Sequence, residues 1–244
     1  MKSKKEQAKS SAKDTLYKRV IPELMRSSPY FSLEAVRKAM NELGVSVTAG
    51  TLKFYMSDAM SKGIVHDAGR GWYSSIAQPF ELDTQPVADI VQRLNKAFPL
   101  LDFSCWSTRQ INPHMHHLLA KFVTFIHVDE AGMRSIGDWL LEAGYNVFVN
   151  PGKVEVEKSF RVRDKTVVVR PGFVEETEEA SHVAPIEMIL ADLLYEAEKL
   201  PLMARDEARD AVENAMLSGR ISTAYFVTLA KRRHVDAFIP KSTN

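Results

Sequence analysis

Within residues 14–78 the spacing of apolar residues changes from a helical period to short extended runs, and this change limits the folds that the segment can adopt. Apolar residues recur every three or four positions in three successive stretches, which predicts amphipathic helices over residues 15–26, 33–43 and 48–62. Two short extended runs then flank the glycine-rich turn 68–71, which is typical of a β-hairpin. Three helices followed by a hairpin within about 60 residues is the layout of a winged helix-turn-helix, so we predict that fold here.

The ends of the predicted helices carry signals of their own. Ser32 is an expected N-cap of the second helix, and Ser46 or Thr48 of the third, because short polar side chains accept free backbone N–H groups. Gly44 and Gly63 are expected to end these two helices. The side chains expected on the buried faces share the helical spacing: Leu16, Val20, Leu24, Met25, Leu33, Val36, Met40, Leu43, Leu52, Tyr55 or Met56, Ala59 and Met60.

The first predicted helix contains Pro22, whose ring and missing N–H disturb a helix interior. We expect this proline either to begin the helix or to kink it.

Positive charge is concentrated in the N-terminal part. Residues 1–74 hold 13 Lys and Arg against 7 Asp and Glu, and the remaining 170 residues hold 19 against 24. Such asymmetry suggests different partners for the two parts and makes the basic part the candidate for binding nucleic acid. Residues 1–13 are rich in Lys and Ser and lack apolar periodicity, so we expect a disordered basic arm there.

A second domain is expected after a linker over residues 75–87. Short extended runs alternate with helical patterns, so we predict a mixed α+β or α/β domain over residues 88–244 that ends in helices. Its expected strands cover residues 100–106, 122–128, 146–150, 159–163 and 166–170. Its expected helices cover residues 87–97, 129–144, 185–199, 204–218 and 221–234. The tight connection at residues 164–165 predicts that the last two strands form a hairpin.

The composition excludes several classes of protein. No apolar run approaches the roughly 18–20 residues that a membrane helix needs, and no apolar run follows the N-terminal lysines as in a secretion signal. A single cysteine, Cys105, excludes an internal disulfide and suits a reducing compartment, so we expect a cytoplasmic protein without membrane contact. Since Cys105 lies in an apolar strand, we expect it to be packed rather than nucleophilic.

No sequence pattern points to an enzyme, a cofactor or a bound metal. His114, His116 and His117 lie close together, but no cysteine or carboxylate pattern accompanies them, so a contact or a polar helix start is preferred over a metal site. The acids nearest to a nuclease pattern, Glu155 and Glu157, have the wrong spacing to the following lysine. Phosphate-binding loops and the nucleophile turn of serine hydrolases are also missing from the sequence.

The third predicted helix is the one that would enter the major groove of DNA. Its outward residues would touch bases or phosphates, and they are Thr48, Thr51, Lys53 and either Phe54 or Ser57. Arg70, between two glycines at the hairpin tip, has the place of a wing residue that reaches a phosphate or the minor groove. The complete set of predicted DNA contacts is Lys4, Lys5, Thr48, Thr51, Lys53, Ser57 and Arg70.

The chain resembles the AbiEi-type antitoxins. The N-terminal likeness comprises Phe31-Ser32 at a helix start, Thr51-Leu52 in the next helix and Gly69-Arg70-Gly71-Trp72-Tyr73 in the wing. The C-terminal likeness comprises the runs Leu101–Thr108 and Pro185–Leu194, the second of which has one residue inserted between its proline and its glutamate.

This resemblance implies a bacterial transcriptional autoregulator and antitoxin. Such a protein binds inverted repeats in its own promoter, counters a nucleotidyltransferase-like toxin directly or indirectly, and serves in phage defence. The acidic second domain would then neutralise the toxin, hold a second protomer in a homodimer, or add DNA contacts. Basic residues that could make those additional contacts are Arg161, Arg163, Lys165, Arg170 and Lys231 to Arg233.

Two other functions remain open on the sequence alone. A winged helix can serve as a protein-interaction module without binding DNA. A metal-dependent nuclease is the enzyme alternative, and it would depend on Glu155 or Glu157.

Overall fold

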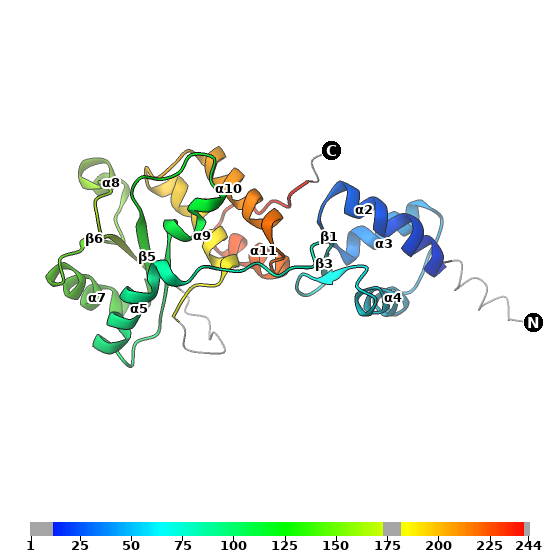
Figure 1. Cartoon of the computed structure of the whole chain (residues 1–244), viewed down its shortest axis with the longest axis horizontal. Coiled ribbons are helices and arrows are strands. Elements are labelled where there is room, and N and C mark those ends of the chain that lie inside the picture. Colours follow the sequence, from blue (N-terminus) through cyan, green and yellow to red (C-terminus); the bar gives the residue numbers. More distant parts are fainter. Residues whose placement is uncertain (1–11, 173–181, 242–244) are drawn as a thin grey trace, which may run out of the picture. The chain divides into compact units, whose positions relative to one another are not determined.

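The computed structural model shows a mixed α/β protein and describes residues 12–172 and 182–241 (Figure 1). The chain divides into two units. Unit 1 comprises residues 1–80 and 216–244, and unit 2 comprises residues 81–215. The first boundary lies within the predicted linker. The prediction of one domain over residues 88–244 was wrong, because the last part of the chain belongs to unit 1.

Hydrogen bonds explain this grouping. The Tyr30 hydroxyl donates to the carbonyl oxygens of Met216 and Gly219 at 2.9 and 3.0 Å, and this hydroxyl is buried. The Ser28 hydroxyl donates to the carbonyl of Pro240 at 2.7 Å. The C-terminal segment therefore supplies partners to polar groups of the N-terminal segment, and sequence periodicity gives no sign of contacts over such a separation.

Unit 1 begins with helices and continues with a small sheet. Its elements are η1 (Leu16–Val20), α2 (Ile21–Ser27), β1 (Tyr30–Ser32), α3 (Leu33–Glu42), α4 (Ala49–Ser61), β2 (His66–Asp67), β3 (Trp72–Ser74) and α11 (Thr223–Arg232). The three strands are antiparallel in the order β1-β3-β2. The hairpin of β2 and β3 was predicted, whereas β1 was not, because three residues are too few to show an alternating pattern.

The core of unit 1 is formed largely by the predicted apolar faces. Leu16, Val20, Val36, Met40 and Leu52 are buried in one cluster with side chains from β1 and β3. Leu43 was predicted to face inward, and this was wrong, because it follows the last residue of α3 where the chain turns at Gly44 and 37% of its surface is exposed.

Pro22 lies in the first turn of α2, as the first of the two alternatives had it, but it does not interrupt the helix that precedes it. Residues 12–27 are helical throughout, and the turn before the proline is the π-helical segment η1. The N–H of Ile21 donates to the carbonyl of Leu16, five residues back. This wider turn admits the proline, which cannot donate a hydrogen bond of its own.

Unit 2 is built around a four-stranded sheet in the order β4-β5-β7-β6. Its strands are β4 (Phe103–Ser107), β5 (Val123–Val128), β6 (Asn146–Val149) and β7 (Thr166–Pro171). Its helices are α5 (Gln85–Ala97), α6 (Thr108–Ile111), η2 (Asn112–His114), α7 (Glu130–Glu142), α8 (Lys153–Ser159), α9 (Ile186–Lys199) and α10 (Arg205–Ser218), the last of which contains the boundary to unit 1. β4 pairs with β5 antiparallel, and the other two pairings are parallel.

Helices cover both faces of this sheet (Figure 1). The apolar faces of α5 and α7 pack on one face against β4, β5 and β7, through buried residues such as Leu94, Ile136 and Leu140. α9 covers the opposite face, where Ser104 and His127 of the strands meet its side chains. Because both faces are covered, β7 reads as a run of three valines instead of an alternating strand.

The predicted strand 159–163 and its hairpin were wrong. Residues 153–159 form α8, after which residues 160–163 have no regular structure. Gly152 stands at the helix N-cap, and Phe160 is buried at its other end, where its ring lies 4.8 Å from that of Phe148. The turn at residues 164–165 is real, but β7 then continues between β5 and β6 in parallel with both.

Candidate nucleic-acid interface

The start of α3 is tied to the hairpin turn. Ser32 caps α3 as predicted, its hydroxyl accepting the N–H of Ala35 at 3.1 Å. The next residue, Leu33, donates its N–H to the carbonyl of Gly71 at 2.8 Å. The hairpin turn is therefore held against the first turn of α3.

The start of α4 uses two of the predicted contact residues for its own cap. The Thr48 hydroxyl accepts the N–H of Thr51 at 3.2 Å, and the two hydroxyl oxygens lie 2.8 Å apart. Thr48 is exposed and Thr51 is half-buried. Both side chains stand where DNA contact was predicted, but their hydroxyl groups already have each other as partners.

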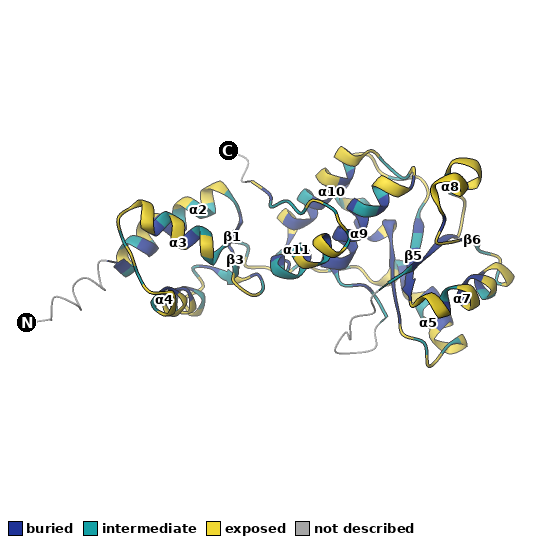
Figure 2. Ribbon diagram, turned by 180° about the vertical axis from the view of Figure 1, so that it is seen from behind, coloured by how far each residue is buried: buried dark blue, intermediate teal, exposed yellow. Residues whose placement is uncertain are grey.

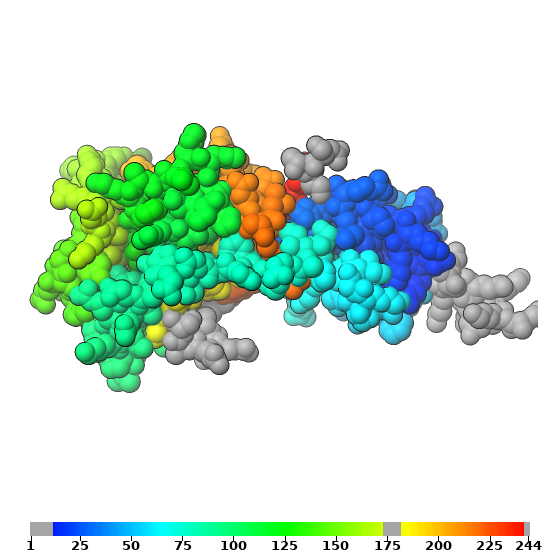
Figure 3. All heavy atoms as spheres, viewed as in Figure 1, coloured from blue at the N-terminus to red at the C-terminus, as the bar shows by residue number. Residues whose placement is uncertain are grey.

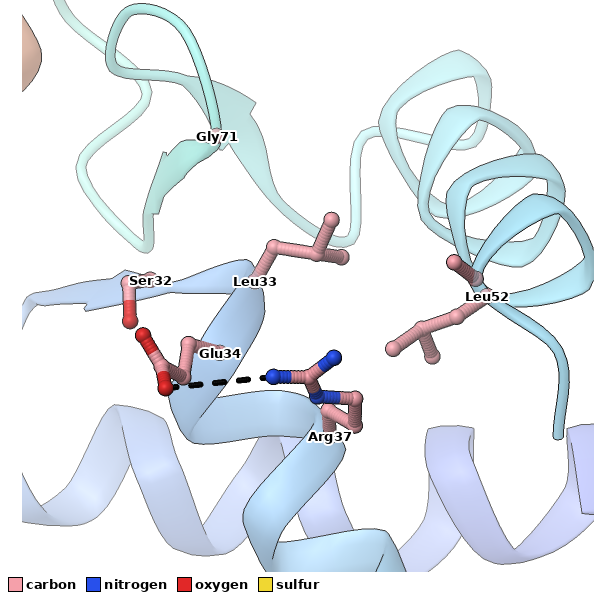
Figure 4. A pocket seen from close by; sticks show the side chains of 7 residues that line it. Ser32, Leu33, Glu34, Arg37, Leu52 and Gly71 are labelled. Carbon is pink, nitrogen blue, oxygen red and sulfur yellow. Dashed lines mark ion pairs between the residues drawn. The ribbon is translucent and has the colours of Figure 1, made fainter. Parts of the chain in front are cut away.

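α3, α4 and the hairpin turn enclose one pocket of about 310 Å³. It is lined by Ser32, Leu33, Glu34, Arg37, Ala49, Leu52 and Gly71. Figure 4 shows Leu33, Arg37 and Leu52 converging on it from α3 and α4. The Arg37 guanidinium is 3.8 Å from Glu34, and both side chains are largely exposed, so this ion pair contributes little and leaves the cation accessible.

The outward face of α4 is exposed along its whole length, as Figure 2 shows in yellow. It presents Ala49, Gly50, Lys53, Phe54 and Ser57. The opposite face is buried through Leu52, Tyr55, Met56 and Ala59, as predicted. The buried face therefore packs α4 against the core of unit 1, and the exposed face is accessible to a partner.

Lys53 and Arg70 are both exposed, and neither makes an ion pair with the residues that the structure describes. Each is the chain neighbour of a residue that lines the pocket, namely Leu52 and Gly71. α4 and the hairpin, drawn in cyan shades, adjoin on one face of unit 1 in the space-filling view (Figure 3). Each cation is thus one residue away in the chain from the pocket that α3, α4 and the hairpin turn share. Lys4 and Lys5 lie outside the described residues.

The hairpin turn rests on α11. Gly69 has φ +91°, and a Cβ atom added there would lie 2.6 Å from Ser222 Oγ and 2.8 Å from Ala224 Cβ. The N–H of Ala224 donates to the carbonyl of Ala68 at 3.3 Å. Because α11 comes from the C-terminal segment, the sequence reading did not connect it with the hairpin.

A polar cluster fixes the first helix on one side of α4. Asp58 accepts hydrogen bonds from Lys62 at 2.6 Å and Tyr17 at 2.5 Å, and Lys13 lies 2.8 Å from it. These groups hold the pKa of the Asp58 carboxyl well below its usual range, the lysine contacts first and the tyrosine next. Burial, and then the hydrogen bond to Asp58, raise the pKa of Tyr17.

The Asp58 cluster makes a pH-dependent contribution to unit 1. Because the folded-state pKa of Asp58 is depressed, its contribution is present above the unfolded pKa of about 4 and is lost as the pH falls below that value. We expect Asp58→Asn to accelerate amide hydrogen exchange in α4 at pH 7, and the difference from the parent chain in the urea midpoint to shrink progressively as the pH is lowered from about 5 toward the depressed folded-state pKa. A difference that did not decrease at all as the pH fell from about 5 to about 2 would contradict this account.

Unit 2 contains a buried polar row that the sequence reading missed. Ser104, His127 and Arg170 stand side by side on β4, β5 and β7. They face Met188, Asp192 and Glu196, which follow one another at intervals of four residues on α9. Ser104 Oγ lies 3.7 Å from Met188 Sδ, His127 Nε2 3.1 Å from Asp192 Oδ2, and Arg170 Nη2 2.7 Å from Glu196 Oε2.

This polar row fixes the position of α9 on the sheet. All of its side chains are at least nine-tenths buried, so a substrate has no access to them in this conformation. The i, i+4 spacing of the two acids on α9 was the available signal, but it is as typical of an exposed helix face as of a buried one. Arg170, read from the sequence as a surface cation, is instead buried in this row and paired with Glu196.

The histidines and acids that the sequence analysis considered as metal or nuclease residues do not form a site in the described part of the chain. His116 and His117 are exposed, and His114 ends η2, where burial lowers its pKa. Within residues 12–172 and 182–241 no three His, Cys, Asp or Glu side chains are placed to hold a metal ion. Glu155 and Glu157 are exposed on α8.

Cys105 is packed as predicted. It is fully buried in β4, and burial raises the pKa of its thiol. Among the helices that the structure describes, none combines the length and apolar character needed to cross a membrane.

The comparisons with known proteins give one match. No curated protein and no solved structure matches the chain. A family model described as "Family of unknown function (DUF6577)" matches residues 51–244, well over half of the chain, from α4 through unit 2 to the C-terminus. The chain therefore belongs to the family of unknown function DUF6577.

Proposed function

We propose that the chain binds duplex DNA through unit 1, with α4 in the major groove and the β2–β3 hairpin against the sugar–phosphate backbone. The observation that carries this proposal is the joint surface of α4 and the hairpin turn, which share one pocket with Arg37 and expose Lys53 and Arg70. A helix and a hairpin that each expose a cation can contact the groove and the flanking phosphates at the same time.

The order of elements in unit 1 supports a winged helix. A helix, a short strand, two further helices and a hairpin follow one another, and the short strand joins the hairpin in one antiparallel sheet. In helix-turn-helix proteins the second helix of the motif reads the groove. Here that helix is α4, and its exposed face carries no acidic side chain over residues 49–57.

The side chains of this surface would have different tasks. Lys53, Arg70 and Arg37 would neutralise phosphates, which supplies affinity without sequence preference. Ser57 can donate to or accept from a base edge, since its hydroxyl has both capacities. The threonine pair that caps α4 would contact DNA through its methyl groups or by exchanging its mutual hydrogen bond for one to DNA.

We further propose that this DNA binding serves transcriptional autoregulation in a cytoplasmic toxin–antitoxin system. The support is the sequence resemblance to AbiEi-type antitoxins, which implies inverted repeats in the chain's own promoter and a nucleotidyltransferase-like toxin. Inverted repeats suit a two-fold symmetric homodimer. Growth after co-expression with such a toxin, if its reading frame lies beside that of this chain, tests the antitoxin part separately from DNA binding.

The test of DNA binding is an affinity measurement on the promoter duplex over a range of salt concentrations. Each phosphate contact contributes about 0.9 to the slope of log affinity against log salt. Replacing Lys53 and Arg70 with Ala should lower that slope by about 2 and weaken binding at 0.1 M salt by about tenfold to a hundredfold.

The matched control replaces one lysine and one arginine of unit 2, Lys96 and Arg134, which are exposed on α5 and α7. This pair of changes removes the same charge and should leave the slope almost unaltered. If the two double variants lost the same affinity, net charge and not the α4–hairpin surface would explain binding. If the parent chain bound no duplex at any salt, unit 1 would be a protein-interaction module instead.

A further inference from the structure

The outward face of α4 carries one large apolar side chain. Phe54 keeps 67% of its surface exposed. The other large apolar side chains that are exposed in the described part of the chain are leucines and valines. Burying aromatic surface is favourable, so a partner that covered this exposed phenylalanine would gain binding free energy from it. Its neighbour Tyr55 points into the core and holds the backbone of this turn in place.

The surroundings of Phe54 favour close approach by a flat partner. Gly50 lies four residues before it, on the same face, and a Cβ atom added there would have no atom within 4 Å. Ala49, next to Gly50 in the chain, extends only a methyl group, so these two residues do not hold a partner away from Phe54. Lys53 supplies a positive charge next to the ring.

The polar side chains of this face are few. The hydroxyls of Thr48 and Thr51 bond to each other, which leaves Lys53 and Ser57 for polar contacts with base edges. The thymine 5-methyl group is the apolar feature of the major groove, and a phenylalanine is one of the side chains that contacts it. Phe54 is therefore suited to thymine and unsuited to the polar edge of the other bases.

We propose that Phe54 contacts thymine 5-methyl groups in the major groove and so sets part of the sequence preference of the chain. This inference rests on the proposed DNA binding, with α4 as the helix in the groove. It names the chemical group that is read, which the phosphate contacts of Lys53 and Arg70 do not determine.

The experiment uses duplexes selected from a randomised pool by the full-length chain. A selected duplex is synthesised twice, once with thymine and once with deoxyuridine, which differs only by lacking the methyl group. Removing a contacted methyl should weaken binding by the parent chain about fourfold for each methyl, the factor that one buried methyl-sized group corresponds to. Phe54→Ala should bind the thymine duplex more weakly and show no difference between the two duplexes.

Leu100→Ala is the matched control, because Leu100 is 98% exposed and lies in unit 2. This variant should keep the full sensitivity to deoxyuridine. Thermal unfolding should be the same for Phe54→Ala and the parent chain, since an exposed side chain is removed.

The outcomes separate this inference from the proposed function. Absence of binding to every duplex overturns the proposed function and this inference with it. Equal affinity of the parent chain for the thymine and deoxyuridine duplexes overturns the inference alone. The inference is also overturned if Phe54→Ala still loses affinity when deoxyuridine replaces thymine. A change in sedimentation coefficient on Phe54→Ala, with the methyl sensitivity kept, would assign Phe54 to a protein interface and also overturn it.

Discussion

Replacing Glu196 with Gln is expected to destabilise unit 2 by about 3–5 kcal/mol, because it leaves the buried Arg170 without a compensating charge. Arg170 donates from Nε and Nη2 to the two carboxylate oxygens of Glu196 at 2.8 and 2.7 Å, and from Nη1 to Asn150 at 3.2 Å. Only 5% of Arg170 and 1% of Glu196 are exposed. Urea unfolding followed by Trp106 and Trp139 fluorescence, in chains that also carry Trp72→Phe, reports on unit 2.

Two further variants make this expectation decisive. Glu198→Gln removes the acid of an exposed pair, whose partner Arg205 lies 3.7 Å away, and should cost less than about 1 kcal/mol. The double change Arg170→Met and Glu196→Leu removes both buried charges and should recover most of the stability that Glu196→Gln loses. Equal effects of Glu196→Gln and Glu198→Gln would show that the buried pair does not hold α9 on the sheet.

Replacing Gly69 with Ala is expected to destabilise unit 1 more than the same change at Gly71. Both glycines have positive φ, +91° and +77°, so an alanine at either position carries a backbone cost of about 1–2 kcal/mol. At Gly71 the new Cβ would have no atom within 4 Å, whereas at Gly69 it would meet α11 at Ser222 and Ala224. Overpacking of this kind adds about 1–3 kcal/mol.

A double-mutant cycle shows whether α11 causes the difference. Ala224→Gly removes the Cβ atom that Gly69→Ala would meet at 2.8 Å. In the double variant the second change should therefore return part of the stability lost by the first, with a coupling energy of about 1 kcal/mol or more. Additive effects of the two changes would mean that the hairpin turn does not depend on α11.

The contact between α11 and the hairpin also affects how unit 1 can be studied. A fragment that ended at residue 80 would lack the groups that bond to Tyr30 and Ser28, together with the helix under Gly69. DNA binding by the full chain is therefore the appropriate measurement. If unit 1 binds DNA as proposed, changes in the C-terminal segment that disturb the hairpin turn should alter that affinity.

Local signals predicted most of unit 1. Helix caps and helical spacing depend on neighbours within a few residues. The structure confirms the caps at Ser32 and Thr48 and the buried positions of Leu52, Tyr55 and Ala59. The short extended runs on both sides of the glycine turn likewise predicted the hairpin. Lys53 and Arg70 were predicted as exposed, and they are, because the same periodicity that selects a buried face also selects its opposite.

Features that depend on distant parts of the chain were beyond these signals. Residues 159–163 alternate polar and apolar side chains, which suits a strand, but Phe160 is buried against Phe148 and residues 160–163 have no regular structure. Arg170 looked like a surface cation because its partner Glu196 is 26 residues away. Thr48 was expected to be free for DNA because its hydrogen bond to Thr51 needs side-chain geometry to be seen.

The central claim is that α4 and the hairpin form the surface that meets DNA, and lysine labelling with and without duplex tests it most directly. Lys53 lies on that surface, whereas Lys96 and Lys158 are exposed in unit 2. Saturating selected duplex should slow acylation of Lys53 several-fold, measured by mass spectrometry, and leave Lys96 and Lys158 unchanged. Undiminished labelling of Lys53 in a saturated complex, with protection confined to the lysines of unit 2, would contradict the account.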